Sequence, residues 1–276
     1  NCNSTYQLHT YERKGASERE YVRPSFSTKT QKAPSSKVVE WFKSRGITQK
    51  TLTDLNVSEG SEFMPQTGKE ENTIKFNYFM GSQLINVKYR DGRKNFKLYK
   101  GAEKVFYNIN SIVGHESCVI VEGEIDALSL HEAGVPNVVS VPNGATLNHN
   151  NLDYLDNCID YFEDKTKIIL AVDADEPGTM LKQEFIRRLG AEVCFLVDFK
   201  DCKDANEFLV KYGKDELKNA IHVSTQVPLE NVTTLKDVEN DLKDFVKHGF
   251  KPGFQVGLSN FDNIFSTYTG QFITVT

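Results

Sequence analysis

The stretch Cys118-Val-Ile-Val-Glu122-Gly123-Glu124-Ile-Asp126-Ala127 decides the fold that this sequence predicts. Its four leading apolar residues have the character of a buried strand. Three carboxylates then follow at alternate positions, and the pattern of an amphipathic helix begins at once. A carboxylate directly after a parallel strand lies at the edge where open α/β sheets bind their ligands. The stretch therefore predicts a strand–helix unit with a candidate site at its turn.

Two further acidic segments follow predicted strands in the same way. The apolar run 167–172 ends in Asp173 and Asp175, and Asp204 comes shortly after a predicted strand at 192–197. Acids at a helix start are common because they face the positive end of the helix dipole, so one such segment alone is a weak signal. Three of them at the tips of one sheet would repel one another, and Mg²⁺, which prefers oxygen ligands, would relieve that repulsion. Two such ions can promote phosphoryl transfer.

The composition is that of a globular protein long enough for one large or two modest domains. The 276 residues are 39% hydrophobic, and no apolar run approaches the length of about 18 residues that a membrane span needs. The five cysteines are scattered without a CxxC motif. This pattern favours a reducing, cytoplasmic compartment in a bacterial or phage-infected cell, with an organelle as the alternative. The first residues contain neither Met nor a signal peptide, so we expect an excised fragment.

The charge of the chain is unevenly distributed. The net charge of −5 argues against nucleic-acid binding, but residues 75–104 hold eight Lys or Arg and two acids, a local charge of +6 that leaves −11 for the remainder. These cations alternate with aromatic residues, a pattern that can pair with phosphates and stack on single-stranded bases. The alternative is an ordinary solvated face of a sheet. The size of the local excess favours nucleic-acid or nucleotide binding.

Four regions are expected along the chain: a polar arm or linker at 1–36, a small basic α+β subdomain at 37–112, a domain of alternating strands and helices at 113–222, and a linker helix with the start of a truncated further domain at 223–276. In the arm, Cys2 is either a leftover cysteine or the last ligand of a zinc ribbon. Asp91-Gly92 is a hairpin signal between short antiparallel strands. After residue 113, predicted strands alternate with predicted helices, one of them a polar helix near 148–163. This alternation implies a parallel sheet.

The acidic motifs resemble those of the Toprim domain. The segments that carry the resemblance are Glu122-Gly-Glu-Ile-Asp126-Ala, Ala-Val-Asp173-Ala-Asp175-Glu-Pro-Gly and Lys203-Asp204-Ala-Asn-Glu. Their spacing and the KDANE segment are most similar to the primase halves of phage and organellar, Twinkle-like primase–helicases. Ser44-Arg45-Gly46-Ile47 resembles the helical opening of the primase N-terminal subdomain, and Val87-Lys88-Tyr89-Arg90 resembles its basic strands. The resemblance covers about residues 36–222 and implies a Toprim fold, a Rossmann-like parallel sheet with flanking helices.

The resemblance also implies a role for each acidic residue. The implied metal ligands are Glu122, Asp173, Asp175 and Asp204, of which the first three are catalytic. Glu122 can in addition carry the proton of the attacking 3′-hydroxyl group. The residues expected to support these ligands from behind are Asp126, Gly123 and Lys203. Glu124 stays open between a solvated helix start and a wall of the site. The implied cofactor is Mg²⁺ or Mn²⁺, as a pair of ions.

The implied activity is that of a DNA-directed RNA primase. The residues expected to bind nucleic acid or NTP are Lys88, Arg90, Lys94 and Lys97. The expected partners are a single-stranded DNA template, NTPs, the RNA primer and other copies of the chain, which would meet through a helix at 235–248. The segment 270–276 resembles the strand that leads into a P-loop, but no GxxxxGK[ST] motif is present, so no helicase or ATPase activity is expected. The alternatives are a Toprim nuclease and a catalytically silent DNA-binding Toprim module.

Overall fold

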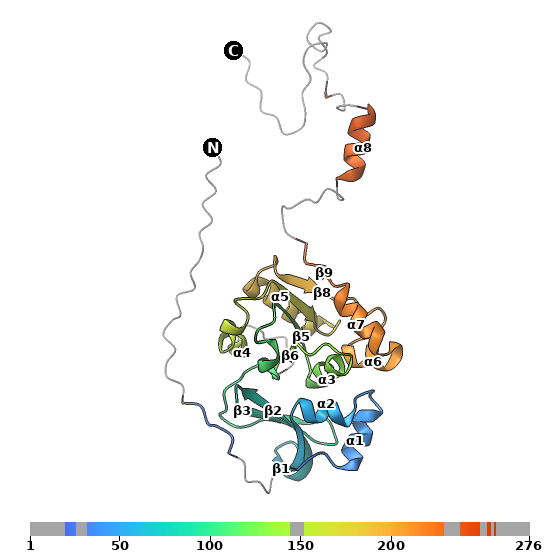
Figure 1. Cartoon of the computed structure of the whole chain (residues 1–276). Coiled ribbons are helices and arrows are strands. Elements are labelled where there is room, and N and C mark those ends of the chain that lie inside the picture. The colour runs from blue at the N-terminus through green and yellow to red at the C-terminus, as the bar shows by residue number, and fades with distance from the viewer. Residues whose placement is uncertain are drawn as a thin grey trace. The chain divides into compact units, whose positions relative to one another are not determined.

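The computed structural model describes residues 20–25, 32–143, 152–228 and 238–248, together with residues 253, 254 and 257. The chain splits into two compact units, Asn1–Val227 and Pro228–Thr276 (Figure 1). Within the described residues no helix is long and apolar enough to cross a membrane. The predicted arm and the predicted strand at 270–276 lie largely or wholly outside the described residues.

The first sheet of the larger unit is antiparallel and carries two short helices. Its elements are α1 (Ser36–Lys43), α2 (Gln49–Asp54), β1 (Val57–Met64), β2 (Lys69–Met80), β3 (Gln83–Arg90) and β4 (Phe96–Leu98), with the strands in the order β1-β2-β3-β4. The predicted turn after β3 is present: the carboxylate of Asp91 accepts hydrogen bonds from the backbone N–H groups of Arg93 at 2.8 Å and Asn95 at 2.9 Å. The turn therefore owes its shape to the side chain of its first residue.

The second sheet is mostly parallel. Its strands are β5 (Ser117–Val121), β6 (Val138–Ser140), β7 (Lys167–Ala171), β8 (Cys194–Leu196) and β9 (Thr225–Gln226), in the order β6-β5-β7-β8-β9, with only the β8–β9 pair antiparallel. Its helices are α3 (Glu124–Glu132), α5 (Glu176–Leu189), α6 (Ala205–Tyr212) and α7 (Lys214–His222). The predicted fold class, an α/β domain behind a small antiparallel α+β subdomain, is confirmed.

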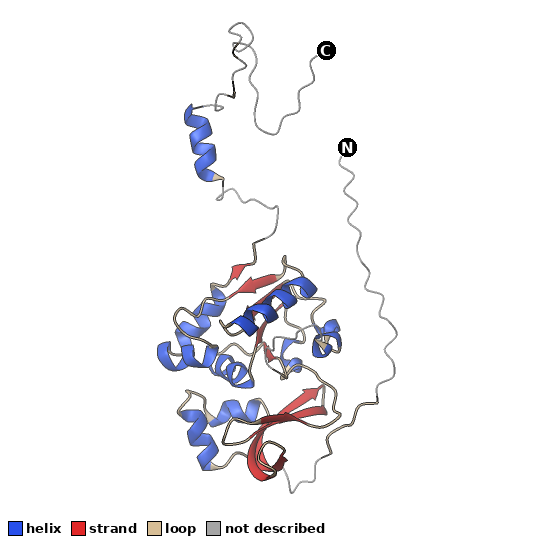
Figure 2. Cartoon of the chain, turned by 180° about the vertical axis from the view of Figure 1, so that it is seen from behind, coloured by secondary structure: helices blue, strands red, loops and turns tan. Residues whose placement is uncertain are grey.

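The strand order places the switch point of this sheet between β5 and β7. The chain leaves β5 toward β6 and leaves β7 toward β8, in opposite directions along the sheet. Since such crossovers are right-handed, α3 and α5 cover opposite faces, as the two opposed views show (Figures 1 and 2). Ligands of open α/β sheets bind where the crossovers diverge. The acidic segments after β5 and β7 lie at this point.

Two elements differ from what the sequence predicts. The polar helix expected near 148–163 is replaced, in its described part, by the short helix α4 (Asp153–Asp156) and a 3₁₀ turn at Ile159–Tyr161. Asn157 interrupts the helix because its side-chain amide donates to the carbonyl oxygen of Lys104 at 2.9 Å. The helix α3 is buried on nearly all sides instead of being amphipathic, because Asp126 and Ser129 on its polar side are buried as well.

The second unit contains the helix α8 (Glu239–His248), which begins within the predicted helix at 235–248. Residues 231–237, and with them the predicted start of this helix, lie outside the described residues. Three apolar side chains of α8, those of Leu242, Phe245 and Val246, are exposed.

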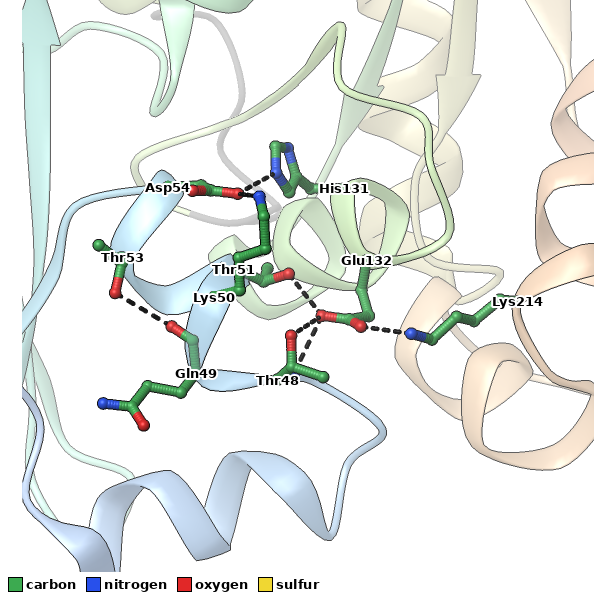
Figure 3. A network of polar contacts seen from close by, with 9 residues as sticks. All are labelled: Thr48, Gln49, Lys50, Thr51, Thr53, Asp54, His131, Glu132 and Lys214. Carbon is green, nitrogen blue, oxygen red and sulfur yellow. Dashed lines mark hydrogen bonds and ion pairs between the residues drawn. The ribbon is translucent and has the colours of Figure 1, made fainter.

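A network of polar contacts around Glu132, at the end of α3, joins the start of α2 in the first subdomain to α3 and α7 of the second (Figure 3). Its carboxylate accepts hydrogen bonds from the backbone N–H and the hydroxyl of Thr48, at 2.9 and 2.8 Å, and also from the hydroxyl of Thr51 and the ammonium of Lys214. Burial alone would raise the pKa of Glu132, but the hydrogen bonds from Lys214, Thr51 and Thr48 outweigh it and lower the pKa to about 2. The carboxylate is therefore held in its charged form between the two halves.

Candidate active site

The acidic residues predicted to form the site come from neighbouring strand ends. Glu122 follows β5 and Asp173 lies two residues beyond β7, and these strands pair in register through Val121 and Ala171. Asp204 caps the start of α6, where its carboxylate accepts the backbone N–H of Glu207 at 2.8 Å. The loop before Asp204 is tied to the loop after β7 by a backbone hydrogen bond from Ala174 to Lys203.

The electrostatics show that these carboxylates form one cluster. Burial and the negative charge of Glu122 raise the pKa of Asp173 to about 6, against the opposing effect of Lys203. Burial also raises the pKa of Asp126 well above its ordinary value, and the charges of Asp204, Asp173 and Glu122 add to that effect. Carboxyl groups that raise one another's pKa lie close together in a poorly solvated place. Such perturbed groups in a cluster are typical of functional sites.

Asp175 behaves differently from the other acids of the cluster. It caps α5, and its carboxylate accepts the backbone N–H of Gly178 at 3.0 Å, the main cause of its lowered pKa. Gly178 is required for close packing at this turn, because a Cβ atom there would come within 2.2 Å of the carbonyl oxygen of Asp173. The turn thus fixes the direction of both aspartates with respect to α5.

Lys203 lies between the two aspartates of the DxD segment. Its ammonium nitrogen is 3.1 Å from Oδ2 of Asp173 and 3.2 Å from Oδ2 of Asp175, although the lysine side chain is 56% exposed. The hydrogen bonds to Asp173 and Asp175 raise the pKa of Lys203 above its ordinary value. A single positive charge therefore already neutralises part of the cluster. The sequence predicted that Lys203 supports the site, but it did not predict that its ammonium group bridges the two aspartates.

The structure describes no group of three or more His, Cys, Asp or Glu side chains that converges on one point in the manner of a metal site, within the ranges given above. The chemistry of the donors nevertheless fits a hard divalent cation, because Glu122, Asp173, Asp175 and Asp204 offer carboxylate oxygens only. The ammonium of Lys203 between two of them is an observed positive charge at this place. Side-chain movements would have to complete the ligand set.

Asp126 and Gly123 lie next to the acidic cluster and hold its surroundings in place. Asp126 is buried, and its Oδ1 accepts the backbone N–H of Asn206 at 3.1 Å. A Cβ atom on Gly123 would lie 2.9 Å from the other oxygen of Asp126, so a larger residue would displace that carboxyl group. The side-chain amide of Asn206 donates to the carbonyl oxygen of Arg45, while its Oδ1 accepts a hydrogen bond from the Arg45 guanidinium at 2.9 Å. Asn206 thus links the acidic cluster to the end of α1.

Glu124 is buried, so it is not a solvated helix start. Its carboxylate accepts hydrogen bonds from the ammonium of Lys88 at 2.9 and 3.0 Å and from the hydroxyl of Tyr78, and all three residues are buried. This triad joins β2 and β3 of the antiparallel sheet to the first turn of α3. Lys88, predicted to bind nucleic acid or NTP, is therefore engaged inside the protein.

Two of the three other predicted cations, Lys97 and Arg90, also make internal contacts, whereas Lys94 is exposed. Lys97 pairs with Glu62 at 2.7 Å, and Lys94 adopts a left-handed backbone conformation in the turn after β3, with φ of 66°. Arg90 is buried, with its guanidinium carbon 4.5 Å from the centre of the Trp41 ring. Lys88 and Arg90 are therefore buried, and their binding of nucleic acid or NTP stays a prediction.

Three comparisons with known proteins show what this chain is similar to. Residues 119–209 match a family described as Toprim-like. The Twinkle homolog protein of Arabidopsis thaliana, chloroplastic/mitochondrial, is 32% identical over 87% of the chain and 36% of its own length. The primase homolog protein of the same plant is 35% identical over 70% of the chain and 61% of its own length. The chain thus spans 36% and 61% of the lengths of these two relatives, less than two thirds of each.

Solved structures agree with the fold. The primase fragment of the bacteriophage T7 primase-helicase protein superposes with a TM-score of 0.55 and 24% identity, over 72% of this chain and 82% of that one. At this identity the likeness establishes the fold alone. The match to the Toprim-like family is thus confined to residues 119–209. Over a longer part of its length, the chain is similar in sequence to a Twinkle homolog and in fold to a phage primase.

Several residues at the site were not predicted from the sequence. Trp41, Arg45, Tyr78 and Asn206 all contact predicted site residues or their direct neighbours. Arg45 and Asn206 lie in motifs that carried the resemblance, and this was the available signal. Their mutual hydrogen bonds join residues far apart in the chain, and no local pattern encodes such a contact.

Proposed function

We propose that this chain is the core of a DNA-directed RNA primase, which joins NTPs into a short RNA primer on single-stranded DNA by metal-dependent nucleotidyl transfer. The observation that carries the proposal is the cluster of Glu122, Asp173 and Asp204 at the switch point of a Toprim-like sheet, where burial and the charge of Glu122 raise the pKa of Asp173 to about 6. Similarity to primases supports the choice of reaction.

In the proposed reaction, the 3′-oxygen of one nucleotide attacks the α-phosphorus of the next, and the bond to the pyrophosphate oxygen breaks. Glu122 would accept the proton of the 3′-hydroxyl group. Asp173, Asp175 and Asp204 would hold Mg²⁺ or Mn²⁺, which when bound supplies charge neutralisation for the triphosphate and the leaving pyrophosphate. Asp126, through Asn206, would keep the loop of Asp204 in place. The protein contributes mainly positioning and electrostatic stabilisation.

The wider assignment belongs to the same proposal. The division into a basic subdomain at 37–112 and a Toprim domain at 113–222 would serve template and NTP binding on one side and catalysis on the other. The region 223–276 would be a linker helix and the start of a helicase domain, and α8 would contribute to assembly with other copies. The compartment would be the cytoplasm of a bacterial or phage-infected cell, or an organelle, as in the name of the Arabidopsis relative.

Primer extension tests this proposal. A short RNA annealed to a DNA template, labelled NTPs and Mg²⁺ or Mn²⁺ avoid any need for template selection. The wild-type chain should extend the RNA, while Glu122→Gln and Asp173→Asn should each reduce extension by about 100-fold or more. Asp215→Asn, on the exposed first turn of α7, is the matched control and should extend normally.

Two outcomes would contradict the proposal. Metal-dependent cleavage of the template without extension would assign the site to a nuclease. Binding of DNA with neither reaction, under conditions where the chain is folded, would make it a silent Toprim module.

A further inference from the structure

Helix α3 connects the acidic cluster to the first subdomain, which contains α1, α2 and the antiparallel sheet. The first turn of α3 carries Glu124 and Asp126, and its last residue is Glu132. At a rise of about 1.5 Å per residue, the two ends of this helix lie about 12 Å apart. The first subdomain contacts both ends, because Lys88 of β3 binds Glu124 and α2 binds Glu132. Two attachment points on one rigid helix fix an orientation, whereas a single point would permit rotation.

The contact at the last turn of α3 is made by both ends of α2 (Figure 3). Oε2 of Glu132 accepts hydrogen bonds from the backbone N–H of Thr48 at 2.9 Å, from its hydroxyl at 2.8 Å, and from the hydroxyl of Thr51. Thr48 is the N-cap residue of α2, but its side chain makes no capping bond to its own helix. At the other end of α2, Nε2 of His131 lies 3.3 Å from Oδ2 of Asp54. The start of α2 is therefore held by a side chain of another helix.

The two oxygens of the Glu132 carboxylate bind different elements. Oε2 receives the three bonds from α2, whereas Oε1 receives the ammonium of Lys214, the first residue of α7. The side chain of Glu132 is 5% exposed and that of Lys214 is 50% exposed. A charged acceptor makes stronger hydrogen bonds than a neutral one, and a poorly solvated place strengthens them further. Since α3 and α7 both belong to the second subdomain, it is the Oε2 side that connects the two subdomains.

We infer that Glu132 is a positioning residue, which holds α2 on α3 and so keeps the first subdomain in the orientation that the proposed reaction needs. The inference rests on the proposed function, in which the first subdomain binds template and NTP while the acidic cluster carries the chemistry. Glu132 lies at the opposite end of α3 from Asp126, so it acts through the helix and not on the reacting groups. A misplacement of about 1 Å can slow a reaction about 100-fold. Loss of this contact should therefore lower the rate of extension more than the binding of DNA.

Amide hydrogen exchange and primer extension with the full chain test the inference together. In Glu132→Gln, the amides of residues 46–55 should exchange about tenfold faster, while those of β2 and β3 stay protected. Extension of an annealed RNA at saturating template and NTP should fall about tenfold per folded molecule, with the folded fraction measured by circular dichroism. The affinity for the annealed RNA–DNA substrate should change by less than about twofold. A loss of stability alone would lower the folded fraction and leave the rate per folded molecule unchanged.

Matched variants separate the contact with α2 from the rest of the network. Lys214→Met removes the bond to Oε1 and keeps the three bonds to Oε2, so extension per folded molecule should stay within about twofold of the wild type. Thr48→Val removes one hydroxyl donor from an exposed residue and should lower the rate about threefold, which keeps the test decisive if Glu132→Gln does not fold. Cys194→Ala, in the buried part of β8, lowers stability outside this network and should leave the rate per folded molecule unchanged.

Three outcomes would overturn the inference. Faster exchange of α2 in Glu132→Gln with an unchanged rate of extension would make the contact purely structural. Unchanged exchange of α2 would show that Glu132 does not hold this helix. A rate that returns to the wild-type value at high template concentration would assign the effect to binding. If the wild-type chain extends no primer, the proposed function fails, whereas the exchange measurement still decides whether Glu132 holds α2.

Discussion

The acidic strand tips and the basic antiparallel sheet both concentrate one sign of charge, but the fold treats the two concentrations in opposite ways. At the tips, burial and the negative charge of Glu122 together raise the pKa of Asp173 to about 6. In the antiparallel sheet, Lys88 and Lys97 are neutralised by Glu124 and Glu62. A local excess of charge in a sequence therefore does not reveal which charges remain available. Charges that the fold leaves uncompensated are the better candidates for function.

The largest expected effect comes from breaking the most deeply neutralised pair. Glu124→Gln leaves the ammonium of Lys88 buried without its counter-charge, and we expect the free energy of unfolding to fall by about 3 kcal/mol. Equilibrium denaturation in urea measures this change. The double variant Glu124→Leu, Lys88→Met should recover most of the loss, because two apolar side chains can fill the same space.

The control for this prediction is a similar pair on the surface. Glu40 and Lys43 of α1 lie 3.5 Å apart and are both about 70% exposed, at 68% and 71%. Glu40→Gln should change stability by less than about 0.5 kcal/mol. If Glu124→Gln costs no more than this, the buried triad does not join the two sheets.

A smaller effect is expected at Glu132, where the two halves meet. Its folded pKa of about 2 lies below the ordinary value of 4.5, so the bonds around it stabilise the fold fully above pH 4.5 and are lost as the pH falls toward 2. The carboxylate is only 5% exposed, and we expect a contribution of about 2 kcal/mol at pH 7. Urea denaturation at intervals between pH 7 and pH 2 should show a shallower pH dependence for Glu132→Gln than for the wild type.

Glu216→Gln provides the comparison for that measurement. Glu216 is 55% exposed and pairs loosely with Lys200 at 3.7 Å. Its pH profile should follow that of the wild type. Equal slopes for all three proteins would contradict the role of Glu132.

The smallest effect concerns Lys203, the cation observed between Asp173 and Asp175. Lys203→Met removes the ammonium group between Asp173 and Asp175, so a divalent ion no longer has to displace it. We expect Mn²⁺ to bind up to about fivefold more tightly, since an exposed ion pair contributes at most about 1 kcal/mol. Electron paramagnetic resonance of free Mn²⁺ measures this. Lys200→Met, which removes an exposed lysine that pairs with Glu216, should leave the affinity unchanged, and weaker binding in Lys203→Met would reverse the interpretation.

Much of the fold could be predicted because its signals are local. The apolar run before Glu122 and the run before Asp173 are strands, as predicted. The strand β1 was missed, since Val57-Ser-Glu-Gly-Ser-Glu-Phe-Met is largely polar and becomes a strand by pairing along its whole length with β2. Strand formation of this kind depends on the partner more than on the segment itself.

The candidate site also has a part that could be predicted from local sequence and a part that could not. The position of the acids followed from their place after strands, which is a local property. The partners of the cations did not, because Lys88 and Glu124 are 36 residues apart and Arg45 and Asn206 are 161 residues apart. Sequence patterns place a charge on an element, whereas tertiary packing decides whether another charge meets it.

The bond between Arg45 and Asn206 has a consequence for the synthesis of the protein. Arg45 leaves the ribosome 161 residues before its partner, so at translation rates of about 5–20 residues per second it waits for roughly 8 to 30 s. During this interval α1 can form, but Arg45, two residues beyond its end, cannot reach its final contact. The contact between Arg45 and Asn206 is therefore completed only near the end of translation of the larger unit, after the acidic strand tips have already been made.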